Sequence, residues 1–361
     1  MLARKCLDIE LMRILAAFFV IFNHTGTTAF FLFPFYDVHT VSYWGCLFLS
    51  VFCKFSVPLF FMISGALLLD REEEAVKMGG VRRAFHIFLI LLVWSFFYYL
   101  NAVMTGKETF VIKHFLSQFY AKDWNFSYWF LYAYLAFLVS LPLLRRFAHS
   151  LINRDYRYLF FLYVVFIMVI PSVQYLLFQG KHVLNGNVSI GWLAANIVMY
   201  PLAGYVLRHR MKSYWDGKRI LRLWILNIVT ILLSAYLTYY KAKITGVCNE
   251  GSSQAFHNTF VLINAACIFV TCQYWQETSR FLQKIGNSVM SIGGCTFGIY
   301  LMHLFIMRRP EIRALSWKLF HETISAPPIL YGFLYCALVF FIGYIATWIF
   351  KKIPWLRHLV S

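Results

Sequence analysis

A succession of long apolar stretches constrains the fold of this chain more than any other feature. The 361 residues contain ten such stretches, each near the roughly 20 residues that a helix needs to cross a bilayer. In lipid, the backbone hydrogen bonds of each segment must be satisfied internally, so an all-α, polytopic membrane protein is expected. The predicted spans are residues 11–33, 43–69, 84–104, 128–144, 158–178, 188–207, 221–240, 258–275, 291–307 and 329–350.

The composition agrees with a membrane protein. Hydrophobic residues make up 61% of the chain and charged residues 13%, whereas a soluble domain is about half apolar and about a quarter charged. Residues 1–361 are therefore predicted to form a single transmembrane domain with no soluble domain attached. The first span is not expected to be a cleavable signal, because it is too long and contains Arg13 and His24.

The formal net charge of +18 is best explained by membrane topology. If the chain starts in the cytoplasm, the cytoplasmic segments hold 20 of the 33 Lys and Arg residues and the external segments hold 10. This bias predicts that both termini are cytoplasmic. Because the topology accounts for the positive charge, no nucleic-acid partner is expected. Part of this charge remains available to bind an anionic cofactor or lipid.

The eight cysteines do not predict a metal site or a disulfide framework. Most of them lie in apolar stretches, where cysteine behaves as a small hydrophobic residue. There is neither a CxxC motif nor a Cys/His spacing typical of a metal site. The cysteines are Cys6, Cys46, Cys53, Cys248, Cys267, Cys272, Cys295 and Cys336.

Arg13 and His24 lie in the same apolar stretch, eleven residues apart. Eleven helical steps of about 100° amount to about three turns, so both side chains are expected on one helix face, roughly 16 Å apart. Ionisable residues inside a span are costly and usually functional. A neutral imidazole is the usual general base near neutral pH. The alternative is a buried histidine that only hydrogen-bonds between helices.

His303 is the second candidate for chemistry. Tyr300 precedes it by three residues, so the two side chains share a helix face. Counted from the cytoplasmic ends of their spans, His24 and His303 both lie roughly 18–20 Å deep, and they could line one cavity. The alternative is belt packing for Tyr300 and a solvated helix end for His303.

Further cations and aromatic residues occur at both ends of the spans. Lys54 lies deep in the second span and must face a cavity or a partner, or it braces the helix break at Pro58. Cytoplasmic arginines either set the topology or hold the phosphates of a cofactor; these are Arg71, Arg82 and Arg83. External residues form either an interfacial belt or a platform for a sugar ring; these are Asn125, Trp129 and Tyr132.

Four segments together resemble the membrane acyltransferases of acyltransferase family 3. LDIELMRILAAFFVIFNHTG is similar to the family's first span, which carries Arg or Lys, ten residues and then His, as Arg13 and His24 do here. KFSVPLFFMISGALLL resembles its second span. FSYWFLYAYLAFLVSLPLL and TFGIYLMH resemble its Trp-Phe-Leu…Pro and Tyr-Leu-x-His segments. Some members carry two arginines three residues apart after the second span. Here only Arg71 matches, so Arg82 and Arg83 are the better candidates.

The resemblance implies a multi-pass enzyme of the bacterial plasma membrane. It would transfer an acyl group, usually acetyl, from cytoplasmic acyl-CoA to a hydroxyl of a cell-envelope glycan or glycolipid, without a metal. His24 would be either the base or an acyl carrier, with His303 and Tyr300 orienting the acceptor or stabilising the oxyanion. The predicted site comprises His24, Arg13, His303 and Tyr300 for catalysis, Arg13, Arg82, Arg83 and Lys54 for acetyl-CoA, and Trp129, Asn125 and Tyr132 for the acceptor.

Two other classes of protein are considered. A transporter or flippase for a sugar-linked lipid would also explain the helices and the basic mouth, but it would not need Arg13 and His24 in register. A structural scaffold explains none of the buried charges. Hydrolysis of acetyl-CoA, or formation of an acetyl-enzyme, by the purified protein without an acceptor separates the enzyme from both.

Overall fold

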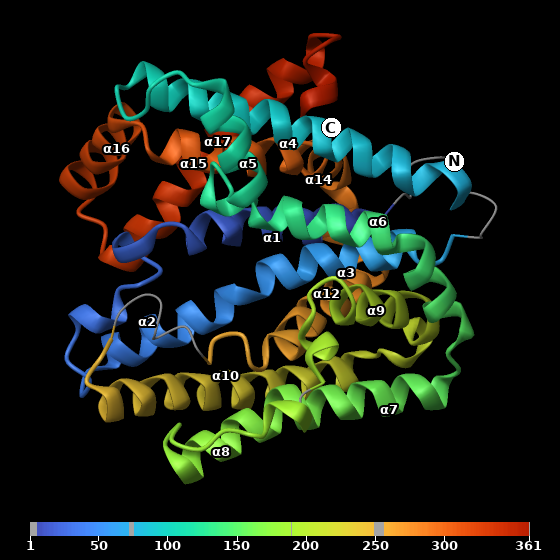
Figure 1. Cartoon of the computed structure of the whole chain (residues 1–361). Helices are drawn as coiled ribbons and strands as arrows, with labels where there is room; N and C mark the ends of the chain where they lie inside the picture. Colours follow the sequence, from blue (N-terminus) through green and yellow to red (C-terminus); the bar gives the residue numbers. More distant parts are fainter. Residues whose placement is uncertain (1–5, 72–75, 189, 249–255, 361) are drawn as a thin grey trace.

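The computed structural model describes residues 6–71, 76–188, 190–248 and 256–360, and all regular structure in these ranges is helical (Figure 1). Six helical segments are long and apolar enough to cross a membrane, or seven if a pair bent by 58° counts as one span. The segments are Val41–Leu68, Gly80–Met104, Phe126–Ser150, Asn153–Phe178, Gly217–Thr245 and Pro328–Lys352, and the bent pair is Gly286–Gly293 with Thr296–Met307. This establishes an all-helical protein with several candidate spans; the expected count of ten is not confirmed.

The helices are numbered in chain order, with η for 3-10 and π turns. Those of the first half are α1 Leu7–Asn23, η1 Gly26–Thr28, η2 Phe33–Phe35, α2 Val41–Phe52, η3 Cys53–Phe55, α3 Ser56–Leu68, α4 Val76–Met104, α5 Ile112–Ala121, η5 Phe126–Tyr128, α6 Trp129–Ser150, α7 Asn153–Tyr163, η6 Val164–Val169 and α8 Ile170–Phe178. Those of the second half are η7 Gly186–Val188, η8 Gly191–Ala194, α9 Met199–Tyr205, η9 Val206–Arg210, η10 Lys212–Tyr214, α10 Gly217–Thr245, α12 Val261–Thr278, α13 Arg280–Lys284, α14 Gly286–Gly293, α15 Thr296–Met307, α16 Pro310–Ser316, η11 Trp317–Thr323, α17 Pro328–Lys352 and η12 Arg357–Leu359.

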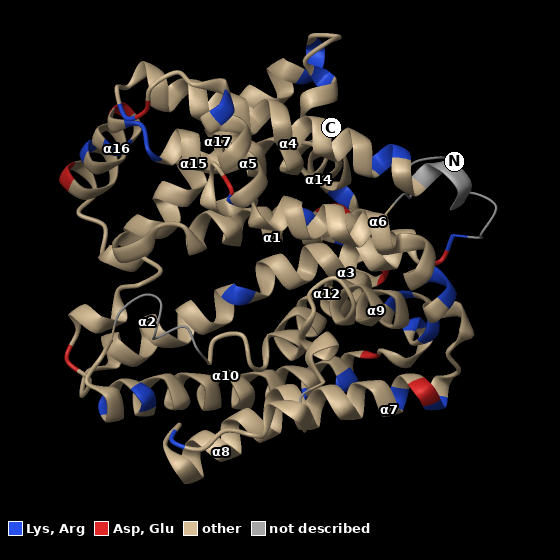
Figure 2. Cartoon of the chain, viewed as in Figure 1, with Lys and Arg blue, Asp and Glu red and all other residues tan. Residues whose placement is uncertain are grey.

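Helix α1 occupies the centre of the bundle. It contacts α3, α12, α14, α15 and α17, and Figure 1 shows it running between the upper and lower groups of helices. Its first turn is held by a partly buried ion pair, in which Arg208 Nη1 donates to the buried Asp8 Oδ2 at 2.7 Å. Most Lys, Arg, Asp and Glu residues lie toward the two ends of the bundle, at left and right in Figure 2. We call these ends the terminus end, where α1 begins and α17 finishes, and the far end.

The expectation that one helix runs through residues 11–33 is wrong, because α1 ends at Asn23. The next residues satisfy the free carbonyls of the last turn locally. The Thr25 hydroxyl donates to the Phe22 carbonyl at 2.8 Å and accepts from the Phe30 N–H at 2.9 Å. Gly26 follows with φ of +52°, a left-handed conformation that favours glycine. His24 is therefore the C-cap of α1, at the point where the chain turns away.

The expectation of a single helix over residues 188–207 is also wrong. This region contains the short turn η8 and the seven-residue helix α9, which continues into the π turn η9. Helix α9 packs against α3 with the two backbones in direct contact. A Cβ atom at Gly65 would lie 2.0 Å from the Pro201 carbonyl oxygen, and one at Gly204 would lie 1.9 Å from that of Met62. Small residues allow this approach between membrane helices.

The ninth expected span, residues 291–307, is broken near its start. Helices α14 and α15 meet there at a bend of 58°, and Gly293 ends α14 against α1. A Cβ atom at Gly293 would lie 2.5 Å from the Glu10 Cβ atom, so only glycine fits this contact. The break places α15 beside the end of α1, where His24 lies.

Candidate active site

His24 and His303 lie together in the middle of the protein. Their ring centroids are 5.2 Å apart and the ring planes are inclined by 25°. The turn after α1 presents His24, and α15 presents His303, which is fully buried. The Phe126 ring meets the His24 ring edge-on at 4.7 Å. The structure thus brings together the two histidines that the sequence placed at one depth.

The backbone fixes the orientation of the His303 ring. His303 Nδ1 lies 2.5 Å from the Tyr300 carbonyl oxygen. Because a carbonyl can only accept, Nδ1 carries the proton, and Nε2 of the neutral ring is an acceptor. Within the described residues Nε2 is buried without a hydrogen-bond partner. Such groups are rare in proteins, and this one is suited to accept a hydrogen bond from a bound hydroxyl.

Tyr300 links α15 to the turn η5, which precedes α6. Its hydroxyl donates to the Ser127 carbonyl oxygen at 2.5 Å, and its ring centroid lies 5.7 Å from that of His303. The Tyr128 hydroxyl donates in the opposite direction, to the Leu301 carbonyl at 2.9 Å. These two bonds clamp the segments on either side of the histidine pair. The Tyr300 hydroxyl is thus engaged by the protein backbone.

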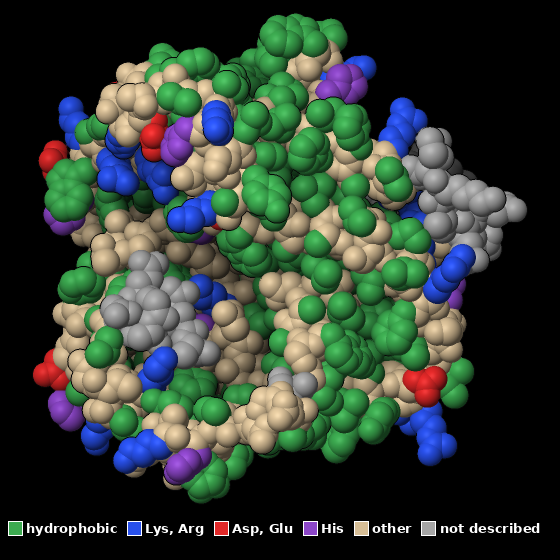
Figure 3. Space-filling view, viewed as in Figure 1, with side chains coloured by type: hydrophobic (Ala, Val, Ile, Leu, Met, Phe, Trp, Pro, Cys, Tyr) green, Lys and Arg blue, Asp and Glu red, His purple; other side chains and the backbone are tan. Residues whose placement is uncertain are grey.

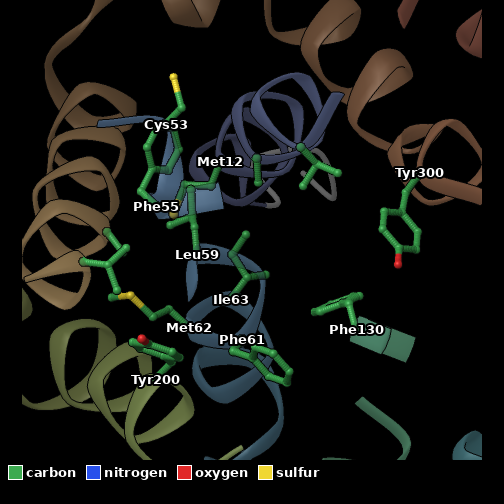
Figure 4. Packing of buried hydrophobic residues seen from close by; sticks show 14 of the residues in the cluster. Met12, Cys53, Phe55, Leu59, Phe61, Met62, Ile63, Phe130, Tyr200 and Tyr300 are labelled. Carbon is green, nitrogen blue, oxygen red and sulfur yellow. The ribbon is translucent and has the colours of Figure 1, made fainter. Parts of the chain in front are cut away.

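A cavity of about 520 Å³ opens at the terminus end, and we call it the basic cavity. Its mouth carries four cations, Arg13, Arg71, Arg83 and Lys351. Its walls are mainly apolar and aromatic side chains of α3, α6 and α15. Figure 4 shows Ile63, Phe130 and Tyr300, which lie in its wall, and the Phe130 and Tyr300 ring centroids are 5.6 Å apart. A polyanionic head with an apolar arm fits a cavity of this character.

Arg13 is held at this mouth by a carboxylate of its own helix. Its Nη1 donates to Glu10 Oε1 at 2.6 Å, one turn earlier. The guanidinium retains its other donors for a ligand. Arg83 lines the cavity, whereas Arg82 is exposed and does not. Arg71 does line it, although the sequence favoured Arg82.

A second cavity, of about 690 Å³, opens at the far end, and we call it the far cavity. His24 and the turn that follows it form one wall, and Phe126 lies in another. The remaining wall comes from α15, α16 and α17 and includes Arg308, Arg313, Trp317, Tyr331 and Tyr335. Sequence reasoning missed the two arginines as site residues, because both follow the ninth span and were counted only as loop charge.

A third cavity, of about 330 Å³, also reaches His24, and we call it the side cavity. Lys54 and Trp129 line it together with Tyr200. The structure therefore places Lys54 at a cavity separate from the basic one, with its ammonium 4.7 Å from the centroid of the Phe30 ring. On the face shown in Figure 3, a recess between the upper and lower helices contains Lys or Arg and His side chains.

Of the three residues predicted to bind the acceptor, the structure brings only Trp129 to His24. Asn125 is buried, and its Oδ1 accepts from the Ser127 N–H and hydroxyl, both at 3.1 Å. The Tyr132 hydroxyl donates to the Phe119 carbonyl at 2.7 Å. Neither side chain lines any of the three cavities. Asn125 caps the turn η5, and Tyr132 ties α6 to α5.

These features define a class of protein: a multi-pass helical membrane protein with a histidine pair between cavities at opposite ends of the bundle. Within the described residues no group of three or more His, Cys, Asp or Glu side chains could hold a metal ion. A model of the acyltransferase domain of acyltransferase family 3 matches residues 7–348, so the chain belongs to this family of membrane acyltransferases. Comparison with curated proteins and with solved structures gives no significant match.

Proposed function

We propose that this enzyme transfers an acyl group, most simply acetyl, from acyl-CoA to a hydroxyl of a cell-envelope glycan or glycolipid. One observation carries the proposal. Tyr300 lines the basic cavity and His24 lines the far cavity, and the His303 ring neighbours both, 5.7 Å and 5.2 Å from their ring centroids. A donor in one cavity and an acceptor in the other would therefore meet at the histidine pair.

The basic cavity suits acetyl-CoA as the donor substrate. Its cations at the mouth match the phosphates, and arginine can bind them with two parallel hydrogen bonds. The apolar walls between Arg13 and Tyr300 suit the pantetheine arm and the thioester. The excess of Lys and Arg in the expected cytoplasmic segments supports a cytoplasmic position for this mouth in the bacterial plasma membrane.

His24 is the group best placed to activate the acceptor. In direct transfer it takes the proton of the acceptor hydroxyl as that oxygen attacks the thioester carbon. The carbon–sulfur bond then breaks, and the CoA thiolate leaves and receives the proton. In the covalent alternative an imidazole nitrogen of His24 attacks the thioester carbon, the carbon–sulfur bond breaks, and the CoA thiolate leaves and receives the imidazole proton. The acceptor oxygen then attacks the acyl carbon, the carbon–nitrogen bond breaks, and the imidazole takes the proton of the acceptor hydroxyl. In either route His303 Nε2 can accept a hydrogen bond from the acceptor and hold its hydroxyl toward His24.

The proposal is tested with purified protein in nanodiscs. Acetyl-CoA supplied without an acceptor should be hydrolysed slowly or should leave an acetyl group on the protein, and His24→Ala should abolish either result. A flippase for a sugar-linked lipid would instead move its lipid with no consumption of acetyl-CoA. Failure of the wild-type protein to bind or consume acetyl-CoA would overturn the proposed donor.

A further inference from the structure

The far end of the bundle carries a cluster of arginines that form no ion pair with the residues that the structure describes. Arg308 and Arg313 line the far cavity, and Arg308 and Arg309 line a neighbouring cavity of about 300 Å³. Among the described residues, no Asp or Glu lines either cavity. Glu311, on the same segment, forms no ion pair within the part of the chain that the structure describes, and neither do these arginines.

Membrane topology does not explain this cluster. With the basic cavity facing the cytoplasm, the segment after α15 is external, and external segments are normally poor in Lys and Arg. Residues 308–328 nevertheless contain four of them. A requirement for binding is the simpler reason for positive charge on that side.

The two arginines are held with donors to spare. Arg313 Nε donates to the Met307 carbonyl oxygen at 3.0 Å, and the guanidinium also hydrogen-bonds to the Tyr335 side chain, which orients it. A guanidinium has five N–H donors, so others remain for a ligand. The Arg308 guanidinium lies 5.5 Å from the centroid of the Phe126 ring, and the His24 ring lies 4.7 Å from the same centroid. The Arg308 guanidinium and the His24 imidazole thus both lie against the same aromatic ring.

Resting on the function proposed above, we propose that the acceptor is anionic. Arg308 and Arg313 bind a carboxylate or phosphate group of the glycan while a neighbouring hydroxyl reaches His24. Guanidinium groups bind both kinds of anion through paired hydrogen bonds. Trp317 and Tyr331 in the same wall offer aromatic faces to the sugar ring that carries the charge.

The test measures binding to the full chain in phosphatidylcholine nanodiscs, with acyl-CoA absent. Two matched pairs of probes are used: methyl glucuronide against methyl glucoside, and glycerol 3-phosphate against glycerol. The wild-type protein should bind the charged member of at least one pair about tenfold or more tightly, as expected for hydrogen bonds between charged groups. The preference should fall steeply in Arg308→Gln combined with Arg313→Gln.

Two controls separate binding from folding and from net charge. Lys318→Gln removes one positive charge from an exposed residue of η11 that lines neither cavity, and it should leave the preference unchanged. Arg308→Gln alone should weaken the preference without lowering the melting temperature, because the exposed Arg308 side chain contacts the Phe126 ring but forms no salt bridge with the described residues. No preference in the wild-type protein, or full preference in the double variant, overturns the inference.

A second arm separates an acceptor from a lipid headgroup. The same proteins are placed in nanodiscs that contain phosphatidylglycerol, and retained lipid is measured. If only lipid retention depends on the two arginines and no soluble probe binds, they hold a headgroup and the inference is wrong. Acetyl-CoA binding is measured on the same samples. If the wild-type protein shows the anion preference but does not bind acetyl-CoA, the transferase proposal alone is rejected. If it binds acetyl-CoA but shows no anion preference, the anionic acceptor alone is rejected.

Discussion

The imidazole ring of His24 faces that of His303 with the planes inclined by only 25° and the centroids 5.2 Å apart. Two positive charges at this separation would repel each other. A proton on one ring therefore disfavours a proton on the other. Under the proposed function, this suits a pair that handles a single proton, taken from the acceptor hydroxyl and passed to the departing thiolate.

Replacing His24 with alanine should abolish transfer and leave donor binding intact. General-base catalysis typically contributes about 10²–10⁴-fold in rate, and a loss of at least this size is expected. The basic cavity does not include His24, so acetyl-CoA should bind to His24→Ala with wild-type affinity. Calorimetric titration of acetyl-CoA and a transfer assay on the same preparation check both points. A well-folded variant that retains normal turnover would remove His24 from the chemistry.

Replacing Tyr300 with phenylalanine tests whether the tyrosine stabilises an oxyanion or positions the histidine pair. Its hydroxyl is engaged by the Ser127 carbonyl oxygen, so a mainly structural role is expected. The variant should lose about 0.5–1.5 kcal/mol of stability with the hydrogen bond. It should keep kcat within about tenfold of the wild-type value, whereas removal of an oxyanion donor typically costs about 10²–10³-fold. A drop of that larger size at an unchanged melting temperature would assign the oxyanion role to Tyr300.

The sequence predicted part of this site because helix geometry is regular. Depth along two spans placed His24 and His303 together, and spacing placed Tyr300 beside His303. Depth alone does not determine which cavity a side chain faces, which is why Lys54 was assigned to the donor and lies at the side cavity instead. The end of α1 at Asn23 depends on the hydrogen bonds of Thr25 and the left-handed Gly26, and a hydropathy pattern contains no signal for either.

The neighbouring residues Arg82 and Arg83 provide a matched pair of variants. Arg83 lines this cavity and Arg82 does not. Arg83→Ala should raise the KM for acetyl-CoA several-fold and leave kcat unchanged, as expected when ground-state binding is lost. Arg82→Ala removes the same charge and should behave as the wild-type enzyme. Equal effects of the two variants in steady-state kinetics would show that only the general positive potential matters.

The contact between α3 and α9 should be intolerant of a single methyl group. Gly65→Ala places a Cβ atom 2.0 Å from the Pro201 carbonyl oxygen, and overpacking of this kind typically costs about 1–3 kcal/mol or more. The control is Gly45→Ala in α2, where nothing lies within 4 Å of the added atom. The control should be neutral or slightly stabilising, because alanine is the better helix former. Thermal unfolding in detergent compares the two, and similar melting temperatures would contradict the packing described for α9.

A native cysteine allows the orientation of the protein in the membrane to be tested by chemical labelling. Of the eight cysteines, only Cys248 is exposed, and it follows α10 at the far end. A membrane-impermeant maleimide should label it in right-side-out vesicles, and Cys248→Ser should abolish that signal. Desolvation raises the pKa of the Cys248 thiol. The labelling rate should therefore continue to rise with pH beyond the point at which an ordinary cysteine levels off, because only the thiolate reacts.

The same vesicles also determine the side from which the donor enters. If the far end is external, acetyl-CoA should support transfer only when it is supplied on the face opposite Cys248. This is expected because the basic cavity with Arg13, Arg71 and Arg83 opens at the terminus end. Labelling of Cys248 only in inverted vesicles would place both termini outside and contradict the orientation derived from the charge bias. Turnover with donor supplied on the face that exposes Cys248 would reject entry through the basic cavity, whichever way the protein is inserted.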